Sequence, residues 1–289
     1  PELMKLFLIR RTRTFIKDNY AKTDPTNGRK YLEFKNGHKS YFPDRIPKAV
    51  KFKTVDGDQY SRLYSEQMIG LMENLKLPRY GLIHYLDEKK AEAASKYEND
   101  LIANLSRAGE RMMGFCKSTF FKRIDSSGFS FLITLFRHIL RNAVYIYAID
   151  NKLKLPISDE NTFPENFIDD ADINDIFTND DENDEYSSGD NLIKVPNDMR
   201  IYIDKAKEYY NGLIGKNNVQ WIDSKYFKRT LKQQLKKDCE QLIAMINLCD
   251  AWNPQTDQKL NELEDLLSDK HKEDKVCLLY TSDAADDLL

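Results

Sequence analysis

The sequence predicts a mainly α-helical fold, with a helical bundle set between two short stretches of mixed α/β character. Apolar residues recur three and four positions apart from about residue 58 onward, which is the period of one helix face. Residues 1–55 instead hold short apolar or alternating runs separated by a turn signal at residues 23–28. Of the 289 residues, 41% are hydrophobic and 31% are charged, so the chain can bury a core beneath a charged surface as one large domain or two modest ones.

The amino-terminal stretch is expected to contain short strands. An apolar run at residues 7–9 and an alternating run at residues 49–55 both suit β-strands. Residues 41–47 should be extended, because Pro43 and Pro47 each disfavour the helical conformation for the residue that precedes them.

Six helices are expected in the rest of the chain. From the spacing of their apolar residues they cover about residues 60–75, 88–124, 129–150, 197–214, 223–251 and 257–268. Ser126, Ser127 and Gly128 separate the second helix from the third, since serine favours the start of a helix and glycine breaks one. The exposed side of the fifth helix carries Lys228, Arg229, Lys232, Lys236 and Lys237.

A strongly acidic run interrupts this helical pattern. Between Lys154 and Lys194 there are 13 Asp and Glu residues and no Lys or Arg. Such a run repels itself and buries little apolar surface, so residues 158–192 are expected to form a flexible loop. The run lacks the Asp-x-Asp-x-Asn-Gly spacing of a calcium loop, so a solvated loop is preferred over a metal site.

The net charge of −3 conceals an asymmetry along the chain. Residues 1–155 carry 29 Lys and Arg against 17 Asp and Glu, a net of +12, while residues 156–289 carry 15 against 30, a net of −15. This division suggests a part that faces nucleic acid joined to an acidic part. The alternative is a basic face that is simply solvated.

The remaining composition excludes several classes of protein. No run of 18 apolar residues is present, so no membrane span and no membrane partner are expected. Cys116, Cys239 and Cys249 lie on helical patterns without a Cys-x-x-Cys pair, which indicates buried, reduced thiols in a cytoplasmic protein. The four histidines are scattered and show no metal-ligand spacing, so no metal site is expected.

Both ends of the chain are expected to be artificial boundaries. The chain starts with Pro1 instead of Met, which suggests that the amino end is cut. Residues 277–286 resemble the translation of a sequencing-library adapter, so native sequence should stop near Val276. Cys277 is then not a native cysteine, and the alternative is a disordered acidic tail.

Three blocks of the sequence carry a resemblance to a known family. They are residues 8–16 with 42–48, residues 106–115 with 122–131, and residues 257–263 with 275–276. The first holds Leu-Ile-Arg-Arg-Thr-Arg and ends on Pro-Lys; the second holds Lys-Arg-Ile-Asp-Ser-Ser before a helix with Arg-His; the third is a lysine-bearing helix followed by Lys-Val. In this order they resemble the end of the first motor lobe, the helical insertion and the beginning of the second lobe of bacterial Swi/Snf-type helicases of superfamily II.

The resemblance implies a RecA-like fold for the flanking edges and an ATP-dependent DNA helicase or translocase as the parent protein. In that family two lobes close alternately over ATP and Mg²⁺ and step the protein along duplex DNA. The insertion would then grip DNA or couple lobe motion to an attached domain, such as a nuclease of a defence or repair system, by analogy only.

The chain itself lacks the parts that handle the nucleotide. It contains no Gly-x-x-x-x-Gly-Lys-Ser/Thr, no Asp-Glu-x-His and no Gln-x-x-Gly-Arg-x-x-Arg sequence. A phosphate cradle needs glycine-rich backbone N–H groups and a lysine, with an acid that holds magnesium. This fragment alone is therefore not expected to bind or hydrolyse ATP, and no catalytic residue is assigned.

Nine basic residues are the candidate nucleic-acid contacts: Arg10, Arg11, Arg13, Lys117, Lys122, Arg123, Arg137, His138 and Arg141. The first three could contact DNA or the cleft between lobes, or pair with local acids. The last three share one stripe of a helix, since they lie one and four positions apart, and are expected on the side opposite its apolar residues. Each phosphate that they neutralise would steepen the salt dependence of binding by nearly one unit.

The sequence therefore predicts a fragment that links two motor lobes and contacts nucleic acid. Its expected parts are the end of the first lobe (1–57), a basic helical insertion (58–155), the acidic loop (156–193), the second part of the insertion (194–253), the start of the second lobe (254–276) and the adapter artefact (277–289). The alternative is a non-enzymatic helical adaptor that binds nucleic acid or a protein, and a third possibility is a purely structural bundle.

Overall fold

The computed structural model describes residues 13–42, 50–52, 58–158, 192–215, 219–274 and 276, without the side chains of residues 13, 106–112 and 158. The described residues are mainly helical and contain two small antiparallel sheets, which confirms the predicted helical class. They show no parallel sheet of the RecA type. The chain divides into two compact units, one of Pro1–Phe52 with Glu262–Leu289 and one of Lys53–Asn261.

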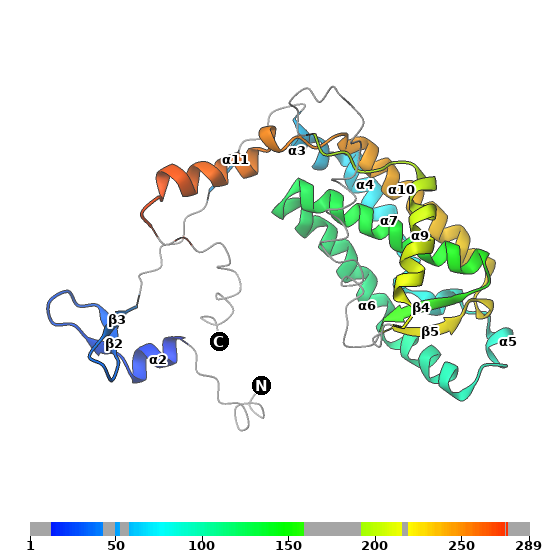
Figure 1. Ribbon diagram of the computed structural model, residues 1–289, viewed down its shortest axis with the longest axis horizontal. Helices are drawn as coiled ribbons and strands as arrows, with labels where there is room; N and C mark the ends of the chain where they lie inside the picture. Colours follow the sequence, from blue (N-terminus) through cyan, green and yellow to red (C-terminus); the bar gives the residue numbers. More distant parts are fainter. Residues whose placement is uncertain are drawn as a thin grey trace. The chain divides into compact units, whose positions relative to one another are not determined.

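The amino-terminal part of the first unit is a short helix followed by a three-stranded sheet (Figure 1). Its elements are α2 (Arg13–Asn19), β1 (Lys22–Thr23), β2 (Lys30–Glu33) and β3 (Lys39–Tyr41), with the strands in the order β1-β2-β3. The predicted turn between β1 and β2 is confirmed: Asp24 accepts a 2.9 Å hydrogen bond from the Thr26 N–H, and Gly28 has a φ of +70°. Tyr41 donates a hydrogen bond to Asp24, which ties β3 to this turn.

The other amino-terminal predictions either concern residues outside the described ranges or are not confirmed. Residues 7–9 lie outside the described residues, as do residues 43–49 and 53–57. Of the strand expected at residues 49–55, the described residues 50–52 are not in a strand. The expected extension at residues 41–47 can be followed only at its start, where Tyr41 ends β3.

The second unit is the helical bundle. Its helices are α3 (Gln59–Leu63), α4 (Glu66–Asn74), α5 (Glu88–Ala91), α6 (Lys96–Ser126), α7 (Gly128–Asp150), α9 (Met199–Leu213), α10 (Arg229–Cys249) and the start of α11 (Gln258–Asp265). Short 3-10 helices connect them: η1 (Pro78–Tyr80), η2 (Leu82–Tyr85), η4 (Ser224–Tyr226) and η5 (Pro254–Thr256). After α11 the chain forms one π-helical turn, η6 (Leu266–Lys270), which belongs to the first unit.

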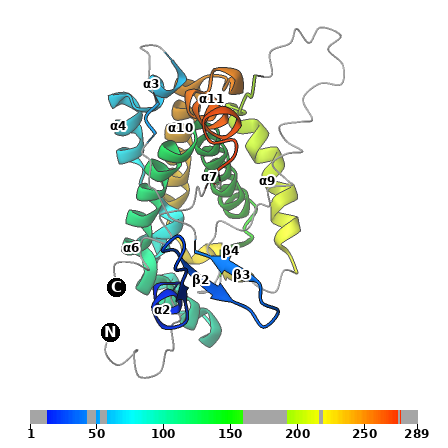
Figure 2. The same cartoon turned by 90° about the vertical axis from the view of Figure 1, so that its left-hand side faces the viewer.

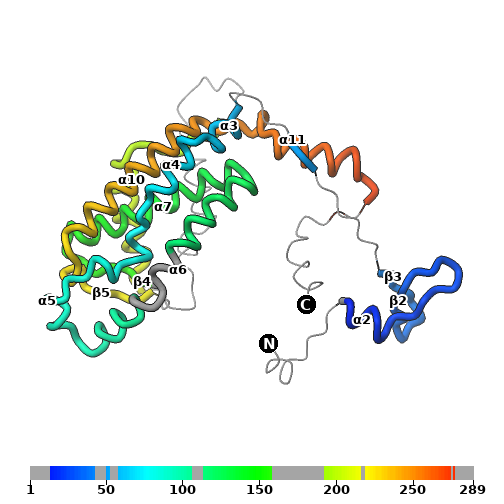
Figure 3. The backbone as a smooth tube through the Cα atoms, turned by 180° about the vertical axis from the view of Figure 1, so that it is seen from behind, coloured from blue at the N-terminus to red at the C-terminus, as the bar shows by residue number. Residues whose placement is uncertain are grey.

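Helix α7 is the central element of the bundle. It packs against α6, α9 and α10 (Figures 1 and 2), while α4 lies along α10 (Figure 3). Phe131, Leu135 and Ile139, three of its apolar residues, have no exposed surface. The core of the bundle therefore surrounds α7, which is covered by α6, α9 and α10.

Serine residues set the helix boundaries. Ser127 caps the start of α7 and ends α6, which confirms the predicted break at that position. Ser65 caps α4 and so divides the helix expected at residues 60–75. Ser95 and Glu98 form a capping box at the start of α6, which divides the helix expected at residues 88–124.

A second sheet was not predicted from the sequence. Strands β4 (Lys154–Ser158) and β5 (Val219–Asp223) pair antiparallel, from Lys154 opposite Asp223 to Ser158 opposite Val219. The helix expected from residue 223 therefore begins only at Arg229. The acidic run at residues 159–191 and the carboxyl end from residue 277 lie outside the described residues.

The predicted burial of the cysteines is confirmed. Cys116, Cys239 and Cys249 are buried, and no disulfide joins them in the described residues. Burial raises the pKa of Cys239 and of Cys249 to about 12, so both thiols stay protonated. Among the described helices, none combines the length and the apolar composition that crossing a membrane requires.

Candidate nucleic-acid interface

The nine predicted contact residues are not brought together as one described surface. Arg10 and Arg11 lie outside the described residues, and Arg13 begins α2 without a described side chain. The other six lie on α6 and α7 of the bundle. Whether any of the nine binds nucleic acid stays a prediction, but their burial decides which ones can reach a ligand.

The three residues on α6 lie at or near the surface. Lys122 is exposed and Arg123 is half-buried. Lys117 donates a 2.7 Å hydrogen bond to the carbonyl oxygen of Glu73, near the carboxyl end of α4. A cation at that end of a helix is favoured by the helix dipole, so Lys117 joins α6 to α4.

The predicted solvent-facing stripe on α7 is wrong for two of its three residues. His138 is 5% exposed and Arg141 is 7% exposed, while Arg137 is half-buried. Neighbouring elements cover the polar side of α7 as well as its apolar side, which a helical period alone does not reveal. His138 and Arg141 are therefore core residues and do not belong to a surface patch.

The buried end of this stripe meets Arg79 of η1. The Arg79 guanidinium lies 3.2 Å from His138 Nδ1, and its Nε donates a 2.7 Å hydrogen bond to Asn142 Oδ1. Burial, followed by the charges of Arg79 and Arg141, lowers the pKa of His138 well below 6.5. His138 is therefore a neutral hydrogen-bond partner inside the bundle at pH 7.

Asp238 of α10 is a second buried polar residue at this level. Its carboxylate accepts backbone hydrogen bonds of 3.2 Å from Lys76 and 2.7 Å from Leu77. Burial raises its pKa, and these hydrogen bonds, together with that of Gln234, oppose the shift. Asp238 thus holds the chain that follows α4 against α10. In the sequence, its burial is indicated by its position on the apolar side of α10, between Leu235 and Leu242.

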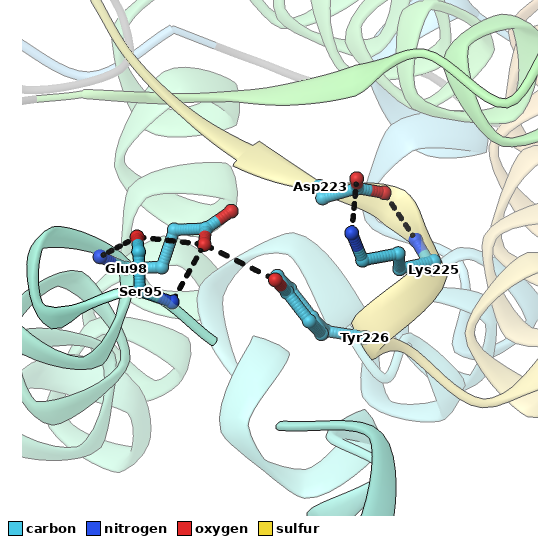
Figure 4. Close-up of polar contacts among 5 residues, drawn as sticks. All are labelled: Ser95, Glu98, Asp223, Lys225 and Tyr226. Atoms are coloured by element: carbon cyan, nitrogen blue, oxygen red, sulfur yellow. Dashed lines mark hydrogen bonds and ion pairs between the residues drawn. The ribbon is translucent and has the colours of Figure 1, made fainter. Parts of the chain in front are cut away.

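A polar contact between α6 and η4 fixes the start of α10 (Figure 4). Tyr226 donates a 3.1 Å hydrogen bond to Glu98 Oε2, the same carboxylate that closes the Ser95 capping box. Next to it, Lys225 pairs with Asp223 at 3.0 Å. These contacts set the direction in which the chain leaves η4 and enters α10.

The basic side of α10 faces outward, as the sequence predicts. Residues 224–237 hold six basic residues and no acidic residue: Lys225, Lys228, Arg229, Lys232, Lys236 and Lys237. All of them are exposed except Lys232, which is half-buried and pairs with Asp150 at the end of α7. Helical spacing places this surface on the exposed side of the helix, although none of its residues is among the nine candidate contacts.

The block that resembles the start of the second lobe is anchored in the bundle. Lys259 Nζ donates hydrogen bonds of 3.0 Å to the Ile124 carbonyl and 2.8 Å to the Asp125 carbonyl at the end of α6. It also lies 4.8 Å from the centre of the Tyr60 ring. Buried Asp257 accepts a 3.0 Å hydrogen bond from the Tyr60 hydroxyl, so α11 starts from a fixed point.

Within the described residues, no group of three or more His, Cys, Asp or Glu side chains could hold a metal ion. Comparison of the chain with protein-family models, with curated proteins and with solved structures gave no match.

Proposed function

We propose that this chain is the helical part of an ATP-dependent DNA translocase of the Swi/Snf type, lying between the two motor lobes and contacting nucleic acid. The sequence blocks that resemble the two lobes precede and follow the bundle along the chain. The organisation of the fold supports this proposal. The chain leaves its first unit at Phe52, folds through the bundle, and joins that unit again at Glu262.

An insertion between lobes needs a firm connection to the lobe that follows it. Lys259 and Asp257 supply one here, because they attach the start of α11 to the end of α6 and to α3. A movement of α11 would therefore reach the junction of α6 and α7 at Ser127. This is the geometry that a coupling element between a motor lobe and a nucleic-acid-binding bundle requires.

The nucleotide site is proposed for other parts of the parent protein. Residues of this chain do not fit ATP and Mg²⁺ in the manner of the family, because the glycine-rich loop, its lysine and the magnesium-binding acid are missing from the sequence. The role assigned to this chain is to bind and to transmit movement. ATP hydrolysis is assigned to the complete motor.

The coding sequence on either side of this segment tests the proposal. We expect an open reading frame that continues in both directions, with Gly-x-x-x-x-Gly-Lys-Ser/Thr upstream and Gln-x-x-Gly-Arg-x-x-Arg downstream. A frame that opens just before Pro1 and closes soon after Val276 would instead establish the adaptor alternative. The purified parent protein should hydrolyse ATP faster with duplex DNA than without it.

A further inference from the structure

We infer that the outer face of the first half of α10 is the surface on which the bundle contacts the phosphate backbone of nucleic acid. This face, called the α10 basic face below, consists of Lys228, Arg229, Lys236 and Lys237. The inference rests on the proposed function, since it names the surface through which that function would be exerted.

The α10 basic face carries charge that its surroundings do not neutralise. Lys225 and Lys232 have carboxylate partners in Asp223 and Asp150. No such partner is found for the four residues of the face within the described part of the chain. Two acids follow the face along the helix: Asp238 is 1% exposed and turned into the core, while Glu240 is exposed and forms no ion pair with Lys236 or Lys237 among the described residues. Four positive charges therefore stand together on one exposed surface.

The spacing of the four cations suits a line of phosphates. Arg229 and Lys236 lie seven positions apart, which is about two turns or 10 Å of helix. From Lys228 to Lys237 the face extends over roughly 13 Å, the length of about four nucleotides along one DNA strand. Because the helix turns by about 100° per residue, Arg229 and Lys236 share one line along it, while Lys228 and Lys237 lie on either side of that line. Their long side chains can meet neighbouring phosphates without any contact to a base.

The start of α10 breaks the usual rules of helix stability. Lys228 is the N-cap residue and makes no side-chain capping bond, Arg229 follows it, and the first turn holds no acidic residue. Cations at this end oppose the helix dipole, which favours an anion there. A bound phosphate would remove the conflict, because it would face both the positive end of the helix dipole and the cations. Such local violations are expected where a surface serves binding.

The face is also held in place before any ligand arrives. The Lys228 N–H donates a 2.8 Å hydrogen bond to the Tyr85 carbonyl, and the Tyr226 hydroxyl donates a 3.1 Å hydrogen bond to the Glu98 carboxylate. Asp238 fastens α10 to the chain after α4 one residue beyond Lys237. The cations therefore differ from lysines on a free surface loop, since their backbone is already ordered.

Fluorescence anisotropy with a labelled 20-base-pair duplex of arbitrary sequence, between 50 and 200 mM salt, tests the inference on the full chain. The test variant combines Lys228→Gln, Arg229→Gln, Lys236→Gln and Lys237→Gln. A control combines Lys152→Gln, Lys194→Gln, Lys205→Gln and Lys207→Gln, with the same change in charge on residues before and along α9. A third variant keeps the charge through Lys228→Arg, Lys236→Arg and Lys237→Arg. Circular dichroism compares their helix content.

The wild type and the control should lose affinity steeply with salt. Four phosphate contacts correspond to a slope of roughly −3.6, or about 100-fold in affinity over this range. The test variant should lose most of that dependence, and the arginine variant should keep it. Equal slopes for the test variant and the control would overturn the inference while leaving the proposed function standing. The absence of DNA binding by the wild type at 50 mM salt would overturn it as well, whereas only the flanking sequence decides between motor and adaptor.

Discussion

The Tyr226 hydroxyl donates a 3.1 Å hydrogen bond to Glu98 Oε2 across 128 residues of chain, and this contact joins the start of α6 to the entrance of α10 (Figure 4). The same carboxylate accepts hydrogen bonds from the backbone N–H and the hydroxyl of Ser95. One acidic side chain therefore caps one helix and positions the segment that precedes another. The orientation of the α10 basic face depends on it.

Replacing Tyr226 by Phe removes this hydrogen bond and keeps the ring. We expect a loss of about 1 kcal/mol in the free energy of unfolding, the usual net value of one such bond. Urea denaturation measures the change. Tyr97→Phe is the matched control, because Tyr97 is 57% exposed on α6, next to Glu98, and should give no measurable change. Equal effects of the two substitutions would show that the bond to Glu98 is not formed.

Two glycines on neighbouring helices should respond in opposite ways to alanine. A Cβ on Gly128 would lie 2.0 Å from the Trp252 ring, which is itself 1% exposed and unable to move aside freely. We expect Gly128→Ala to cost at least about 1–3 kcal/mol in the free energy of unfolding through overpacking.

Gly114 on α6 is the counterpart, because nothing lies within 4 Å of the added methyl group. Gly114→Ala should raise the free energy of unfolding by about 0.5–1 kcal/mol, since alanine is the better helix former. Thermal unfolding of both variants checks the pair. A stabilised Gly128→Ala protein would mean that Trp252 does not pack against the start of α7.

The sequence was sufficient to locate α7 and the exposed side of α10. Ser127 followed by Gly128 marks a helix boundary, and lysines on the side away from Leu235 mark a solvent face. The sequence did not reveal the burial of His138 and Arg141. A helical period shows which side of a helix is apolar, but not how many neighbouring elements cover the other side. The division before α6 could have been found, since Ser95 and Glu98 have the spacing of a capping box.

The β4–β5 sheet could not be predicted from local sequence patterns. Its strands are five residues each and are separated in sequence by α9 and the acidic run, so their pairing depends on tertiary contacts. The burial of His138 was missed for a related reason. Arg79, the residue that engages His138 and Asn142, lies in a short connecting turn that carries no periodic signal.

The buried His138 gives the bundle a defined response to acid. Its folded pKa lies well below 6.5, so below pH 6.5 the unfolded chain binds a proton that the folded chain does not. Stability that is complete above pH 6.5 is then lost at up to about 1.4 kcal/mol per pH unit as the pH falls toward the folded pKa.

Urea denaturation at pH 7 and pH 5.5 should show this loss in the wild type. His138→Gln keeps an acceptor for Arg79 but does not titrate, so it should be less stable at pH 7 and less sensitive to acid. The difference between the two proteins isolates His138 from the carboxylates. An identical pH dependence would indicate that His138 is protonated within the folded bundle.

Lys259 is expected to hold the start of α11. Lys259→Met keeps the apolar stem of the side chain and removes its hydrogen bonds to the Ile124 and Asp125 carbonyls. Amide hydrogens of α11 should then exchange roughly tenfold faster, which corresponds to about 1.4 kcal/mol of lost local stability. Lys207→Met on the exposed surface of α9 is the control and should leave this exchange unchanged. Unaltered protection of α11 in Lys259→Met would mean that other contacts hold the helix.

Acetylation of individual lysines, measured by mass spectrometry with and without duplex DNA, tests most directly whether nucleic acid contacts the α10 basic face. Bound phosphates should shield the exposed ammonium groups of this face. We predict that DNA lowers the acetylation of Lys228, Lys236 and Lys237 several-fold and leaves Lys152, Lys194 and Lys207 unchanged. Equal protection of both groups, or protection of the second group alone, would contradict the account.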